Sequence, residues 1–169
     1  MNKNSFRKWL IICLGIMLLA VIQTGADGIL RVKFIAPDLL FAFAVSFACF
    51  EKKWHNILIC ALISGMVSDF VCHSEIIGYT AVYPYTAILV YFLENQLLRP
   101  NAFFVIVIAL LTFIVGKTVL FPVFYIARGV DFTNFFLNDV LPSGVYNTVC
   151  FFVMYLIFGA VRKRVQKRL

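Results

Sequence analysis

Six apolar segments constrain this chain more than any other feature, because each approaches the length that a helix needs to cross a bilayer, about 20 residues. Of the 169 residues, 63% are hydrophobic and 14% are charged, whereas about a quarter are charged in a typical soluble domain. The excess apolar surface must therefore face lipid. We predict an all-α membrane protein, a single domain over residues 1–169 that forms a bundle of about six transmembrane helices. The expected spans are 9–24, 34–50, 56–71, 76–93, 102–126 and 143–161.

The basic residues predict the orientation of this bundle. The net charge of +7 lies in short runs between the apolar segments and at the two ends, a pattern typical of residues that orient membrane helices rather than bind nucleic acid. With both termini in the cytoplasm, eleven of the 15 basic residues fall on the inner side and three, Arg31, Lys33 and Arg128, on the outer side. The alternative for the first segment is a signal peptide cleaved near Thr24, but an uncleaved helix gives a consistent topology for the rest of the chain.

The longest outer connection, residues 127–142, contains apolar residues at nearly helical spacing. Phe132, Phe135, Phe136 and Val140 approach the i, i+3, i+4 pattern of an amphipathic helix. We expect a short helix that lies in the outer interface or against the bundle. The alternative is an irregular loop with its apolar side chains turned inward.

Three charged residues lie within the predicted spans, where ionisable groups are costly and are candidates for a functional role. Asp38 lies near the outer end of the second span, and Asp69 and Lys117 lie in the outer halves of the third and fifth. At 1.5 Å per residue, the last two are each about 20 Å along their helices. We hypothesise a polar cluster in which the lysine pairs with one or both aspartates and holds the three spans together. The alternative is that each side chain reaches separately to the outer interface.

The remaining residues predict packing rather than chemistry. Gly65, four residues before Asp69, and Gly78, at the start of the fourth span, are small residues that let membrane helices approach closely. The tyrosines of the fourth span, Tyr79 and Tyr83 among them, could line an interface or anchor the helix. The chain has no phosphate-binding glycine loop and no nucleophile elbow, and its five cysteines lack metal-ligand spacing. Cys72 and His73 are adjacent but favour packing over metal binding. We therefore expect no enzyme, no cofactor and no metal.

The order of these features resembles the MreD family of rod shape-determining membrane proteins. The resemblance rests on Pro37-Asp38-Leu39-Leu40, then Gly65-x-x-x-Asp69, then Gly78. It implies a non-enzymatic protein of the bacterial cytoplasmic membrane that acts in peptidoglycan elongation. The implied partners are an MreC-like protein, the MreB filament, and a peptidoglycan polymerase and transpeptidase. Pro37, Asp38, Gly65, Asp69 and Gly78 are structural residues in this interpretation.

The family's bundle also resembles the substrate-binding subunits of energy-coupling-factor vitamin transporters. A small-molecule binder is therefore the alternative function. Such a subunit would need a polar pocket open to the outside, which Asp38, Asp69, Lys117 and Tyr79 could supply.

Overall fold

The computed structural model describes residues 3–25, 37–71, 78–97, 102–119, 129 and 131–166, and every regular element within these ranges is helical. The prediction of an all-α protein is confirmed, and each predicted apolar segment corresponds to one helix. Residues 34–36, 76–77 and 120–126 of the predicted spans lie outside the described residues. The helices are α1 (Lys3–Gly25), α2 (Leu39–Phe50), α3 (Trp54–Val71), α4 (Tyr79–Leu97), α5 (Ala102–Val119), α7 (Phe132–Phe135), the π-helix η1 (Phe136–Val140) and α8 (Leu141–Gln166).

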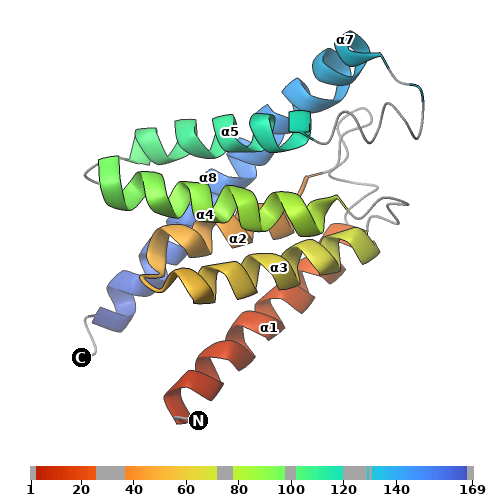
Figure 1. The fold of residues 1–169 in the computed structure, drawn as a ribbon. Coiled ribbons are helices and arrows are strands. Elements are labelled where there is room, and N and C mark those ends of the chain that lie inside the picture. The colour runs from red at the N-terminus through yellow and green to blue at the C-terminus, as the bar shows by residue number, and fades with distance from the viewer. Residues whose placement is uncertain are drawn as a thin grey trace.

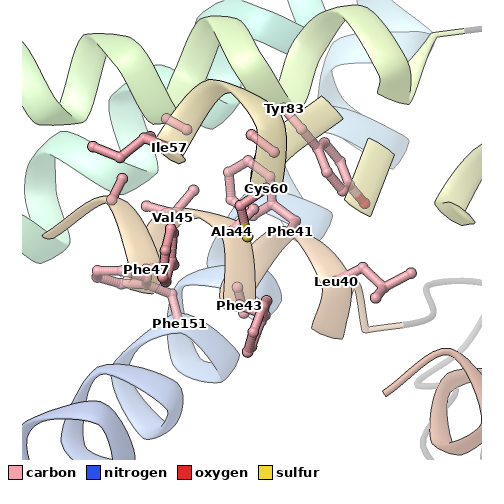
Figure 2. Close-up of a cluster of buried hydrophobic side chains, with 14 of the residues drawn as sticks. Leu40, Phe41, Phe43, Ala44, Val45, Phe47, Ile57, Cys60, Tyr83 and Phe151 are labelled. Atoms are coloured by element: carbon pink, nitrogen blue, oxygen red, sulfur yellow. The ribbon is translucent and has the colours of Figure 1, made fainter. Parts of the chain in front are cut away.

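Helix α2 lies at the centre of the bundle, in contact with α1, α3, α4 and α8. Every residue from Leu40 to Ala48 is buried, because its sequence has only apolar and small side chains to present on all sides. Figure 2 shows how residues of α2 meet Ile57 and Cys60 of α3, Tyr83 of α4 and Phe151 of α8 in the core. The start of α1 and the end of α8 both lie toward the lower left of Figure 1.

Three helical stretches are long and apolar enough to cross a membrane among the residues that the structure describes. They are Phe6–Gly25, Trp54–Val71 and Phe132–Val161. Three shorter apolar stretches, Leu39–Phe50, Tyr79–Leu93 and Ala109–Thr118, belong to α2, α4 and α5. Several apolar helices packed together are the pattern of a multi-pass membrane protein. Six crossings with both termini in the cytoplasm stay predictions.

The predicted helix in the outer connection is present, although it continues directly into the last helix. Its buried side chains include Phe135 and Val140, and its middle widens to a π-turn in which the Leu141 N–H donates to the carbonyl of Phe136. Pro142 follows this turn. Since proline has no N–H and its ring would clash with the carbonyl four residues earlier in a regular α-helix, a wider turn accommodates it without ending the helix.

Candidate functional site

The first turn of α2 begins inside the bundle, where its backbone N–H groups need partners other than water. The Asp38 carboxylate accepts a hydrogen bond from the Phe41 N–H at 3.0 Å, as an N-cap residue does. The side-chain oxygen of Gln23, on α1, accepts from the N–H groups of Leu39 and Leu40 at 3.1 and 3.3 Å. Two side chains therefore satisfy the first three amides of the helix.

Asp38 is also held by residues from two further helices, and a third helix reaches it through Tyr83. Its backbone N–H donates to the side-chain oxygen of Asn147, on α8, at 2.7 Å. The Tyr83 hydroxyl, on α4, donates to the Asp38 carboxylate and lies 2.9 Å from the hydroxyl of Ser68, on α3. Asp38 is 8% exposed, and Tyr83 and Ser68 are fully buried. Pro37, which is also buried, has no backbone N–H that would need a partner at this position.

Asp69 performs the corresponding role for α4 from the neighbouring helix. Its carboxylate accepts from the N–H groups of Tyr79 and Thr80 at 3.0 and 2.9 Å, and from the Thr80 hydroxyl at 2.5 Å. The carbonyl of the buried Gly78 accepts the next two amide protons of the helix. All four N–H groups of the first turn of α4 are thus satisfied, two of them by a side chain of α3.

Gly65 allows α3 to approach the start of α4 closely enough for this capping. A Cβ at Gly65 would lie 2.6 Å from the carbonyl oxygen of Tyr79 and 2.9 Å from the Cα of Thr80. Both neighbours are backbone atoms, which cannot turn away as a flexible side chain can. Because Gly65 and Asp69 are four residues apart, they lie on the same face of α3. The glycine sets the distance and the aspartate makes the hydrogen bonds.

Lys117 reaches the same region from α5. Its ammonium donates to the Tyr79 hydroxyl at 3.1 Å and lies 4.5 Å from the centroid of the same ring, and Lys117 is only 9% exposed. The rings of Tyr79 and Tyr83 pack edge to face with their centroids 5.7 Å apart. The three charged residues thus meet one another through two tyrosines of α4. A direct ion pair between Lys117 and either aspartate stays a prediction.

Together these side chains form a polar network to which α1, α2, α3, α4, α5 and α8 contribute, in two hydrogen-bonded groups that the ring contact of Tyr79 and Tyr83 joins. Its members are Gln23, Asp38, Ser68, Asp69, Tyr79, Thr80, Tyr83, Lys117 and Asn147. The sequence identified the charged members and left the role of the tyrosines open, but it did not identify Gln23, Ser68, Thr80 or Asn147. Each is an uncharged polar residue within an apolar segment, and that feature is the signal by which they could have been found.

The chemistry of this network is structural. Each carboxylate accepts hydrogen bonds from backbone amides at a helix start. Within the described ranges, no group of three or more His, Cys, Asp and Glu residues could hold a metal ion. Cys72 and His73, considered above as a packing pair, lie outside those ranges.

The fold and the network define a multi-pass, all-helical membrane protein whose buried polar groups join its helices. The family model described as rod shape-determining protein MreD matches residues 3–165. The chain therefore belongs to the MreD family, and the resemblance found in its sequence is confirmed. No curated protein and no solved structure matches the chain.

Proposed function

We propose that this protein is a non-enzymatic scaffold of the bacterial cell-shape and peptidoglycan elongation machinery. Its partners in this proposal are an MreC-like protein, the cell-wall polymerase and transpeptidase, and, from the cytoplasmic side, the MreB filament. The observation that carries the proposal is the polar network, because its carboxylates are used to cap helices. Membership of a rod shape-determining family supports the same role.

The outer surface of the bundle suits such a scaffold. Large apolar side chains are exposed along α1 and α8, including Leu14 and Val21 on α1 and Val149 and Leu156 on α8. In a membrane, these surfaces can contact lipid tails or the apolar helices of partner proteins. A bundle that is fixed internally by hydrogen bonds can present such surfaces in a constant arrangement.

The contacts favour this role over the vitamin-binding alternative. Asp38 and Asp69 would be the acidic groups of an outward-facing polar pocket, but both accept hydrogen bonds from backbone amides. The Lys117 ammonium contacts the hydroxyl of Tyr79. A ligand that bound these groups would have to replace the N-caps of two helices. Each cap contributes about 0.5–2 kcal/mol to stability.

The test is to isolate the tagged protein from its native membrane in mild detergent and identify the proteins that accompany it. A different multi-pass protein with the same tag is the control. We expect an MreC-like protein and cell-wall synthases to be recovered with this chain and not with the control protein. Recovery of paired ATPases with a coupling membrane subunit, together with a rise in melting temperature on adding a vitamin, would contradict the scaffold proposal.

A further inference from the structure

A second feature of the molecule, separate from the polar network, is an apolar groove between α1, α2 and α8. Its volume is about 600 Å³, within the range of about 300–1,000 Å³ that is typical of ligand sites. Ile11 lines it from α1, Phe43 and Phe47 from α2, and Ile157 and Phe158 from α8. Gly15 also lines the groove, and a Cβ there would lie 3.6 Å from the ring of Phe43.

Two basic residues, Arg7 and Lys8, lie in the wall of this groove near the start of α1. Lys8 forms an ion pair with Glu51, which also accepts hydrogen bonds from the Asn56 side chain and the Lys53 N–H. Burial raises the pKa of Glu51, but these three hydrogen bonds outweigh it and leave the pKa below its usual value. The glutamate is therefore ionised at neutral pH and balances the charge of Lys8.

Arg7 gives the groove its net positive charge. Its side chain is exposed, and no carboxylate within the described ranges forms an ion pair with it. A guanidinium group presents two parallel N–H donors to a phosphate, and it keeps its charge at any physiological pH. The site thus combines an apolar groove with a phosphate-binding group at one end.

We propose that this groove binds one anionic phospholipid, with an acyl chain along the phenylalanines and the phosphate at Arg7. Basic pockets between transmembrane helices are known sites for anionic lipid headgroups. A partner's apolar transmembrane helix fits less well, since it offers no anionic group to Arg7 at the end of the groove.

The two halves of the lipid have different roles in this site. An acyl chain that moves from bulk lipid into the groove leaves one apolar environment for another, so its gain is limited to packing. Preference among lipids must then come from the headgroup. One basic residue near the membrane surface contributes enough binding free energy for about a fivefold preference for an anionic over a zwitterionic headgroup.

Native mass spectrometry of the full chain can test this proposal. The protein is equilibrated in detergent with equal amounts of phosphatidylglycerol and phosphatidylcholine that carry the same acyl chains. We expect one retained lipid, with about a fivefold preference for phosphatidylglycerol. The Arg7→Gln variant should retain a lipid without preference. Lys52→Gln, which removes an exposed lysine outside the groove, should keep the wild-type preference.

Gly15→Leu tests the position of the acyl chain. A side chain larger than a methyl group at this position fills the space in front of Phe43, so retention of both lipids should fall. If this variant does not elute as a single folded species, the comparison of Arg7→Gln with Lys52→Gln decides alone. The proposal is overturned if wild-type protein retains no lipid, if it shows no headgroup preference, or if Arg7→Gln keeps that preference.

Discussion

Replacing Gly65 with alanine should destabilise the protein far more than an added methyl group normally does. The new Cβ would lie 2.6 Å from the Tyr79 carbonyl oxygen, 2.9 Å from the Thr80 Cα and 3.0 Å from the Tyr79 carbonyl carbon. All three atoms belong to the backbone of the first turn of α4. The methyl group can be accommodated only if α3 and α4 move apart, and that movement stretches the hydrogen bonds from this turn to Asp69.

Three contributions determine the size of the effect. Overpacking a close-packed site costs about 1–3 kcal/mol, and contacts to backbone place this site at the upper end. Weakening one hydrogen bond to a charged carboxylate costs about 1.5 kcal/mol or more. The higher helix propensity of alanine returns about 1 kcal/mol. We therefore expect Gly65→Ala to lower the free energy of unfolding by about 3.5 kcal/mol.

Two other helical glycines provide matched controls for this measurement. A Cβ at Gly159 would have its nearest contact at 3.8 Å, to the ring of Phe50, so Gly159→Ala should be neutral or stabilising. A Cβ at Gly116 would lie 2.9 Å from a methyl group of Val82, and that side chain can move, so Gly116→Ala should be intermediate. Unfolding in mixed micelles, titrated with sodium dodecyl sulfate, gives all three values. If Gly65→Ala is as stable as Gly159→Ala, the close approach of α3 and α4 is wrong.

Three further substitutions test other contacts by the same titration. Tyr83→Phe removes the hydroxyl that contacts Asp38 and Ser68 and should cost about 1.5–3 kcal/mol; unchanged stability would exclude this hydroxyl as a link in the network. Lys117→Met should destabilise the bundle because it removes the ammonium from the Tyr79 hydroxyl, and an unchanged midpoint would contradict the polar-cluster hypothesis. The lowered pKa of Glu51 stabilises the folded state fully above the usual value of 4.5, and this contribution is lost as pH falls below it. Glu51→Gln should flatten that pH dependence, whereas an identical acid profile in both proteins would refute the prediction.

Much of the fold could be predicted because a bilayer allows few solutions. Long apolar segments in lipid favour helices, since a helix pairs most of its backbone amides within its own segment. The helices were predicted from the apolar segments, and Asp38, Asp69 and Gly65 were singled out as candidates by their charge or size within those segments. The join between η1 and α8 could not be predicted, because proline usually begins or ends a helix, and a π-turn that admits Pro142 has no sequence signal of its own.

The connections within the site were less predictable than its members. A charged residue in an apolar segment is easy to identify, but which residue it contacts depends on the rotation of each helix about its axis. Large apolar side chains occur on both lipid-facing and protein-facing surfaces, so they do not report that rotation. For this reason Gln23 and Asn147 were missed, although each supplies an oxygen to an amide at the start of α2. Similarly, Tyr83 could not be distinguished from an ordinary interface tyrosine.

The length of α2 explains why acceptors are needed around its start. The helix has 12 residues, which span about 18 Å, whereas the hydrocarbon core of a bilayer is about 30 Å thick. A helix this short, at the centre of a bundle, exposes its first amides where there is no water to bind them. The neighbouring helices must then supply acceptors, and the chain does so with Gln23, Asp38 and Asn147. Substitutions in the network should therefore reduce the stability of the bundle before they change the binding of any partner. A loss of partner capture at unchanged stability would instead point to surface positions such as the exposed apolar side chains, and these are where membrane contacts of the proposed scaffold should be sought.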